Sequence, residues 1–191
     1  MSRATMNVKI PIERIGVLIG VNGNVKKKIE ETLNVKLKID SESGDVQIIL
    51  NPNTEDPSSI FRARDVVLAI GRGFSPERAF RLLENEEVML RIIDLKDIFG
   101  RSPSNFKRVK GRVIGKEGKT RRLIEELTGA QVSVYGKTIS IIGTPEEVEV
   151  AEEAIKMLIK GAMHKTVYRY LFRRKRELKR RMAFELWEGS E

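Results

Sequence analysis

VIGKEGKT, residues 113–120, and IGVNG, residues 19–23, share the pattern Ile-Gly-x-x-Gly. Both stretches belong to a longer internal repeat, because residues 14–40 align with residues 109–135 at an offset of 95. The alignment pairs three glycines and the isoleucine before each turn: Gly16 with Gly111, Gly20 with Gly115, Gly23 with Gly118, and Ile19 with Ile114. What the two copies share is therefore the first guide to fold and function.

The hydrophobic pattern around each turn predicts the same order of elements twice. In the first copy we expect strands at residues 6–11, 36–40 and 46–50, and helices at 12–19, from the turn to about 33, and from 58 or 59 to about 72. In the second copy we expect strands at 88–95, 131–134 and 138–142, helices at 106–114, 120–127 and after Thr144, and a loop insertion at 102–104. Thr144, Pro145 and Glu147 carry the residue types of a capping box.

This order predicts an α+β protein built from two β-α-α-β-β-α modules, each with a three-stranded sheet and helices on one face. We expect the first module at residues 1–73 and the second at residues 87–163. Residues 74–86 are predicted to hold one linking helix, from Ser75 to about Leu83. Residues 164–191 are predicted to add a basic C-terminal helix, mainly over 166–187.

A Gly-x-x-Gly turn that opens a helix is suited to hold a sugar-phosphate backbone. Glycines carry no Cβ, so another chain can come close to the turn. The free N–H groups and the positive dipole end of the following helix then point at the phosphates. The second turn has more basic residues around it than the first, whose two central residues are Val21 and Asn22.

Composition excludes several kinds of chemistry. The 191 residues include no Cys and a single His, His164, so disulfides, Cys-ligated zinc, thiol catalysis and a His cluster are excluded. Carboxylates such as Glu125 and Glu126 are interpreted as solvated helix residues, since adjacent positions on a helix point about 100° apart. We therefore predict no catalytic residue, metal or cofactor. The N-terminus lacks a signal-peptide pattern and no apolar run is long enough to span a membrane, so a soluble cytoplasmic protein is expected.

The net charge of +9 is concentrated near the C-terminus, where residues 165–181 hold nine Lys or Arg and one Glu. Such a basic stripe favours a polyanionic partner. An apolar stripe on the same segment includes Val167, Leu171 and Leu178. One interpretation docks the helix by this stripe and turns arginines toward nucleic acid, with a patch of Arg169, Arg173, Arg174, Arg176 and Arg180. The others are a protein contact anchored by Phe184 and Trp187, and, least favoured because the stripe is narrow and broken, a membrane-surface helix.

A nucleotide-hydrolysing P-loop is the main rival interpretation of the second turn. Gly118-Lys119-Thr120 supplies the end of that motif, but the position of its first glycine is Val113. The residues just before the turn are too basic for the buried strand that a P-loop follows, and the first copy lacks Gly-Lys-Thr. We therefore disfavour this interpretation.

The repeated IGVNG (19–23) and VIGKEGK (113–119), each before an amphipathic helix and two strands, resemble the KH family of RNA-binding domains, in its type I order. The resemblance covers nearly all of residues 6–161 and implies a groove that takes a few unpaired nucleotides. The second copy fits better, so we expect it to bind RNA more tightly, and the first to bind weakly or to serve as a scaffold. The candidate RNA-binding residues are Arg112, Ile114, Gly115, Lys116, Glu117, Gly118, Lys119, Arg121, Arg122, Val132 and Val134 in the second copy, and Gly20, Val21, Asn22, Gly23, Lys26 and Lys27 in the first. Ile124 is a further candidate for the wall of the second groove.

Two divergent copies, a linking helix and a basic C-terminal helix resemble the archaeal Krr/partner-of-Nob (Dim-type) family of ribosome assembly factors. That resemblance implies an adaptor that binds single-stranded RNA near the 3′ end of small-subunit rRNA. It also implies, as partners, the Nob-type endonuclease, the rRNA dimethyladenosine transferase or the alpha subunit of translation initiation factor two. The alternatives are a KH subunit of an RNA processing or degradation complex, and a KH-fold scaffold that binds proteins.

Overall fold

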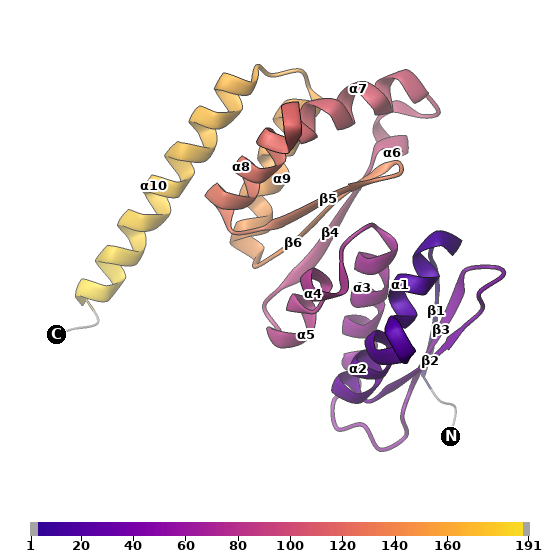
Figure 1. Ribbon diagram of the computed structural model, residues 1–191. Helices are drawn as coiled ribbons and strands as arrows, with labels where there is room; N and C mark the ends of the chain where they lie inside the picture. The colour runs from indigo at the N-terminus through magenta and orange to yellow at the C-terminus, as the bar shows by residue number, and fades with distance from the viewer. Residues whose placement is uncertain (1–3, 189–191) are drawn as a thin grey trace.

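The computed structural model describes residues 4–188 as two modules of similar build followed by a long helix (Figure 1). The first module contains strands β1 (Thr5–Lys9), β2 (Val35–Ile39) and β3 (Asp45–Leu50) and helices α1 (Ile15–Ile19), α2 (Asn24–Leu33) and α3 (Ser59–Gly71). Short 3-10 turns precede α1 (Ile12–Arg14) and form the first glycine turn (Val21–Gly23). The strands form an antiparallel sheet in the order β1-β3-β2.

Alternation along the strands places one face of this sheet against the helices. Val8, Leu37 and Ile48 are buried in the first core. The residues between them, such as Lys36 and Lys38, are exposed on the opposite face. In α2, Val25, Ile29 and Leu33 are all buried, as their spacing predicts for one helix face.

The second module repeats the plan with an antiparallel sheet in the order β4-β6-β5. The capping box at Thr144 is confirmed, because its side chain accepts from the Glu147 N–H while the Glu147 carboxylate accepts from the Thr144 N–H. The elements of this module are β4 (Met89–Asp94), α6 (Leu95–Phe99), α7 (Pro103–Ile114), the 3-10 turn Lys116–Gly118, α8 (Lys119–Thr128), β5 (Gln131–Tyr135), β6 (Thr138–Gly143) and α9 (Pro145–Ile159). Two tandem type I KH domains, as predicted, account for this architecture.

Two local expectations were wrong. The predicted loop insertion at 102–104 is the start of α7, with Ser102 as N-cap and Pro103 in the first turn, where its missing N–H costs no hydrogen bond. A short helix, α6, precedes it, and its N-cap is Asp94, whose side chain accepts from the Lys96 N–H. The linking helix is in fact two short helices, α4 (Pro76–Ala79) and α5 (Arg81–Glu84).

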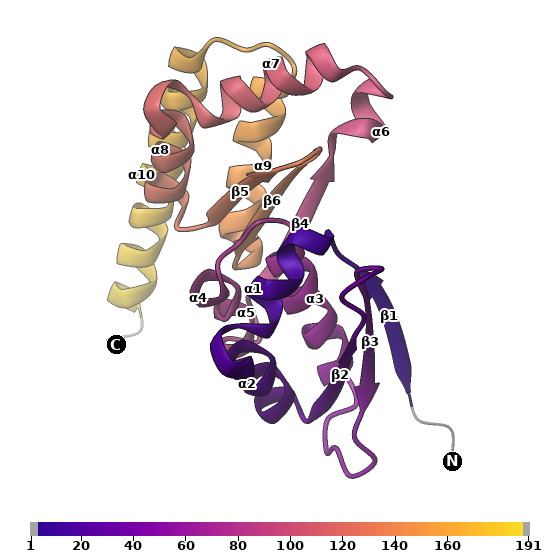
Figure 2. The same cartoon turned by 45° about the vertical axis from the view of Figure 1, so that its right-hand side comes forward.

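The two modules pack against each other through the second sheet. One face of that sheet carries α7, α8 and α9, while α3 and the linking segment lie near its other face (Figure 2). Ile142 of β6 is fully buried and belongs to the core of the first module. Ser133 of β5 donates to the Arg72 carbonyl at 2.8 Å, and the Tyr135 hydroxyl donates to Glu13 at 2.6 Å. The second sheet is therefore covered on both faces, whereas the first has helices on only one.

Helix α10 (His164–Glu188) follows α9 and runs back along the second module (Figure 1). Its first half is anchored, because Val167 and Leu171 are fully buried in the second core. Residues 181–188 at the end of α10 are all exposed. No helix within residues 4–188 combines the length and the apolar character that a bilayer crossing requires. The division of the chain into four segments stays a prediction.

Candidate nucleic-acid interface

The two glycine turns have the same backbone. Gly20 and Gly115 lie at φ 75°, ψ 176° and φ 72°, ψ 175°, and Gly23 and Gly118 lie in the left-handed region at φ 74° in both turns. Non-glycine residues inside the turns, Asn22 and Glu117, also have φ near +54°, at 53° and 54°. The internal repeat is therefore also seen in the backbone angles. In each module a helix begins at the residue directly after the turn.

The glycines of a turn are required for different reasons. A Cβ on Gly115 would come closer than 3.0 Å to the backbone nitrogen and side chain of Thr120, and one on Gly20 would collide with Asn24 and Val25. A Cβ on Gly118 or Gly23 would meet no atom within 4 Å. The first glycine therefore packs the turn against the helix that follows. The second glycine leaves bare backbone open to another molecule.

The side chains around the turns differ. Lys116 and Lys119 are exposed beside the second turn, and no ion pair or hydrogen bond among residues 4–188 engages their ammonium groups. Val21 is 75% exposed in the first turn, and Lys26 and Lys27 face Glu30 and Glu31 at 4.0 and 3.7 Å. Uncompensated positive charge therefore lies at the second turn.

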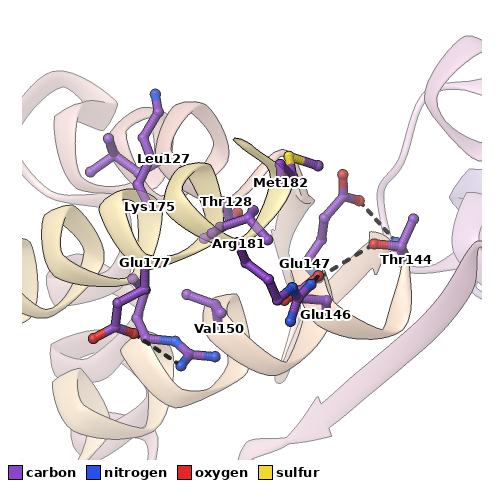
Figure 3. Close-up of a pocket in the computed structure, with 12 residues that line it drawn as sticks. Leu127, Thr128, Thr144, Glu146, Glu147, Val150, Lys175, Glu177, Arg181 and Met182 are labelled. Atoms are coloured by element: carbon purple, nitrogen blue, oxygen red, sulfur yellow. Dashed lines mark hydrogen bonds and ion pairs between the residues drawn. The ribbon is translucent and has the colours of Figure 1, made fainter. Parts of the chain in front are cut away.

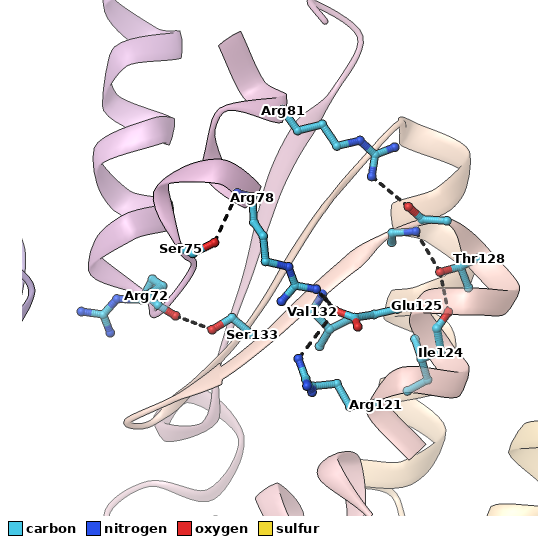
Figure 4. A network of polar contacts seen from close by, with 12 residues as sticks. Arg72, Ser75, Arg78, Arg81, Arg121, Ile124, Glu125, Thr128, Val132 and Ser133 are labelled. Atoms are coloured by element: carbon cyan, nitrogen blue, oxygen red, sulfur yellow. Dashed lines mark hydrogen bonds and ion pairs between the residues drawn. The ribbon is translucent and has the colours of Figure 1, made fainter. Parts of the chain in front are cut away.

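Glu125 joins α8 to β5, along which the RNA groove of the second module is predicted. Its carboxylate accepts from the Val132 N–H at 2.8 Å, and in the first module Glu30 accepts from the Leu37 N–H at the same distance. In the second module Glu125 also pairs with Arg78 of the linking segment and lies 3.8 Å from Arg121 (Figure 4). The linking segment therefore contacts the second module where α8 and β5 are joined.

The comparisons with known proteins agree with this geometry. Residues 89–176 match a model described as a eukaryotic type KH domain (KH-domain type I), and residues 15–85 match one described as the Krr1 KH1 domain. A KH domain-containing protein of Methanocaldococcus jannaschii is 52% identical over 181 residues, which is 95% of this chain and 78% of that protein. A chain of Pyrococcus horikoshii, solved in a complex described as a/eIF2alpha-aDim2p-rRNA, superposes on this protein with a TM-score of 0.85 and is 54% identical in sequence. The match covers 92% of this chain and 96% of the Pyrococcus chain.

The chain belongs to the Pno1/Dim2p family of tandem KH proteins. A more distant relative, the RNA-binding protein pno1 of Dictyostelium discoideum, is 29% identical over 161 residues, which is 84% of this chain and 67% of that protein. The predicted family and the predicted fold are both confirmed.

Some candidate residues of this family member have other roles in the structure. The Arg112 guanidinium donates to the carbonyls of Leu158 and Ala162, so it caps the C-terminal end of α9. Ile124 and Val132 are fully buried in the second core, whereas Ile114 and Val134 are half-buried. In this conformation Ile124 and Val132 therefore do not offer their side chains to a ligand, whereas Arg112 is half-buried with its guanidinium engaged at the end of α9.

The remaining predicted residues lie around the turn. Arg122 donates to the Glu117 carbonyl at 3.0 Å, which supports the loop from its outer side. Gly115, Lys116, Gly118 and Lys119 lie together at the junction of α7 and α8. Their role in binding stays a prediction.

The predicted basic patch on α10 is divided: one of its arginines lines a cleft against the second module, which Figure 3 shows, and the other four are exposed. Arg174 pairs with Glu177 at 3.3 Å and lines a cleft of 340 Å³ between the second half of α10, the end of α8 and the start of α9. Across this cleft Arg181 pairs with Glu146 at 2.8 Å. Arg169, Arg176 and Arg180 are exposed, and Arg173 is exposed beside Glu177 at 3.9 Å.

Sequence reasoning missed the arginines of the linking segment. Arg81 donates to the Gly129 carbonyl at 2.8 Å and pairs with Glu147 at 2.6 Å, and Arg78 pairs with Glu125 (Figure 4). All three acceptors belong to the second module. In the sequence, two basic residues three positions apart in a segment predicted to be one helix carry no signal that distinguishes them from solvated charges.

Proposed function

We propose that this protein is a single-stranded RNA-binding adaptor in small ribosomal subunit assembly. It binds rRNA near its 3′ end, mainly through the turn at Gly115–Gly118. The observation that carries the proposal is the open backbone at Gly118 beside two lysines without partners. A phosphate placed there meets free N–H groups at the start of α8 and two mobile positive charges.

The relatives support the same function. The Dictyostelium relative is named an RNA-binding protein, and the Pyrococcus relative was solved in a complex whose description includes rRNA and a/eIF2alpha. We therefore include the alpha subunit of translation initiation factor two among the partners of this chain. The Nob-type endonuclease and the rRNA dimethyladenosine transferase remain candidate partners on the ground of family alone.

Replacing Gly118 by Asp tests the proposal. The new side chain has open space, so the module is expected to fold, while a carboxylate now faces the phosphates. We expect Gly118→Asp to weaken binding of a single-stranded oligoribonucleotide from the 3′ end of the small-subunit rRNA about tenfold or more, the order of one charge-assisted contact. Fluorescence anisotropy of the labelled oligonucleotide measures the change.

Two matched variants control this experiment. Gly23→Asp makes the same change in the first turn, where we expect a loss of about threefold or less. Gly136→Asp lies at the tip of the β5–β6 hairpin, also at positive φ and with open space, and controls for the cost of Asp in that conformation. If only Gly23→Asp loses affinity, the first turn and not the second is the main RNA contact. If the unmodified protein does not bind RNA, the proposal is wrong and the protein-binding scaffold is the remaining alternative.

A further inference from the structure

A hollow lies on the side of the second turn that faces away from β5. It has a volume of 410 Å³ and is enclosed by the end of α7, the start of α8 and the first turn of α10. Arg108, Gly111 and Gly115 follow one face of α7 and the turn at helical spacing, and Lys116 and Lys119 complete the same wall. His164 and Tyr168 of α10 form the opposite wall.

The wall from α10 is fixed in position by hydrogen bonds. His164 Nε2–H donates to the Arg112 carbonyl at 3.0 Å, and the Tyr168 hydroxyl is hydrogen-bonded to Thr120 Oγ1 at 2.8 Å. Val167 is buried in the core on the neighbouring side of α10. The hollow is therefore formed jointly by the KH module and the helix that follows it.

The hollow and the KH groove lie on different sides of α8. Thr120 contacts α10, whereas Glu125 contacts β5, and five residues along a helix turn the direction of a side chain by about 140°. The glycine turn lies between the two sides. A strand that leaves the groove across the turn therefore passes next to the hollow.

The charged side chains around the hollow are all cationic: Arg112 donates to the carbonyls of Leu158 and Ala162, and the other three have no partner in the described part of the chain. Arg108 is exposed, and like Lys116 and Lys119 it makes no hydrogen bond or ion pair with any residue of the range 4–188. No Asp or Glu lines the hollow. Gly111 adds no side chain to the floor, and a Cβ there would meet nothing within 4 Å.

The first module provides an internal comparison. A hollow of 470 Å³ lies at the corresponding place, between the end of α1, the start of α2 and the linking segment. Under the offset of 95, its Val21 and Asn24 correspond to Lys116 and Lys119, and its linking-segment wall contains Glu77. The same cavity is thus present in both modules, but only the second is lined with cations.

We infer that the hollow beside the second turn binds a phosphate group of the RNA strand outside the nucleotides held in the KH groove. The inference rests on the proposed function, because it needs RNA at the second turn. It extends the site to Arg108 and to α10. Arg108 supplies charge to the phosphate, and His164 and Tyr168 hold the wall that shapes the cavity.

The test uses the full chain and three RNA probes with the same sequence, taken from the 3′ end of the small-subunit rRNA. The first has about four nucleotides, the length that one KH domain reads. The other two carry additional abasic ribose-phosphate units at the 5′ or at the 3′ end. These units add phosphates without bases, so they do not compete for the groove.

The unmodified protein is expected to bind one of the extended probes more tightly than the short one, and Arg108→Gln is expected to remove that gain. For Arg108→Gln, affinity for that extended probe is expected to fall about threefold, the order of one exposed charge contact. The slope of log K against log salt for the same probe is expected to become shallower by about 0.7. Arg108 aligns with Glu13 of the first copy, so Arg108→Glu introduces the residue type found there. This variant is expected to lose more affinity for the same probe than Arg108→Gln. Lys38→Gln removes the same charge from the open face of the first sheet and is expected to retain the gain.

Equal binding of all three probes by the unmodified protein overturns the inference. So does an Arg108→Gln variant that retains the gain, or that loses the same factor on the short probe. Failure of the proposed function is a separate result, in which the short probe does not bind or binds Gly118→Asp as well as the unmodified protein.

Discussion

The two KH modules share a backbone and differ in what surrounds it. Their turns agree in φ and ψ to within a few degrees, and the Glu30–Leu37 and Glu125–Val132 hydrogen bonds are equivalent. The second module, however, has unpaired lysines at its turn, a sheet covered on both faces, and an additional helix behind the turn. The glycines and core residues therefore keep the fold the same, whereas the charge around the turns differs at a few exposed positions.

The largest expected effect tests the part of the comparison in which the modules agree. Gly115→Ala places a Cβ against Thr120 in a backbone region open almost only to glycine, which we expect to cost about 3 kcal/mol of folding stability. Gly118→Ala has open space and should cost about 1 kcal/mol, the cost of a left-handed residue with a side chain. Urea unfolding followed by circular dichroism measures both.

The corresponding pair in the first module, Gly20→Ala and Gly23→Ala, is the control. We expect the same ranking, since a Cβ on Gly20 would also collide and one on Gly23 would not. An equal cost for the two glycines of a turn would contradict the different roles that the structure gives them.

The next effect sharpens a difference between the modules. Glu125→Ala leaves the Val132 N–H and the Arg78 guanidinium without their acceptor, and we expect a loss of about 3 kcal/mol or slightly less. Glu30→Ala leaves the Leu37 N–H unpaired and loses only a 4.0 Å contact with Lys26, so about 1.5 kcal/mol is expected. Chemical unfolding of both variants gives the two losses.

A double-mutant cycle with Arg78→Ala tests whether the larger stability loss of Glu125→Ala, compared with Glu30→Ala, comes from the contact with Arg78. If the linking segment is the reason for the difference, Glu125→Ala and Arg78→Ala couple, and Glu30→Ala and Arg78→Ala are additive. Coupling in neither pair would mean that the contact in Figure 4 contributes nothing to stability.

The smallest expected effect concerns pH at the contact between the modules. The hydrogen bond from the Tyr135 hydroxyl lowers the pKa of Glu13 below the ordinary value of 4.5 for a glutamate side chain. A carboxylate with a lowered folded-state pKa stabilises the fold above its unfolded pKa, and this contribution is lost as the pH falls through the folded value. Tyr135→Phe should therefore be slightly less stable than the unmodified protein near neutral pH, and this difference should shrink as the pH falls below 4.5, which flattens the acid limb of the variant's stability profile. Thermal unfolding across this range is the measurement, and an unchanged acid limb would contradict the assignment.

The turns, the order of elements and the capping box were predictable because each has a local signature. Glycine spacing fixes the turns, period-2 and period-3.6 patterns fix strands and helices, and Thr144 with Glu147 marks a helix start. The first turn of α7 was misread because Ser102 and Pro103 are residues of both loops and helix starts.

The site was predictable only in part. Lys116 and Lys119 could be assigned to the turn by position alone. The engagement of Arg112 with α9, and of Arg78 with Glu125, joins residues 46 and 47 positions apart, and neither contact has a local pattern. Nor does the sequence show which of several apolar residues near a groove is a core residue, because Val132 and Val134 differ only in how neighbouring elements cover them.

The arginines of the linking segment have a consequence for long ligands. Arg78 and Arg81 connect the segment to three acceptors of the second module, while the same segment is packed into the core of the first. An RNA strand bound at the first turn would then meet the second turn at a local concentration set by this fixed geometry and not by a flexible tether, so binding at both turns would raise the overall affinity.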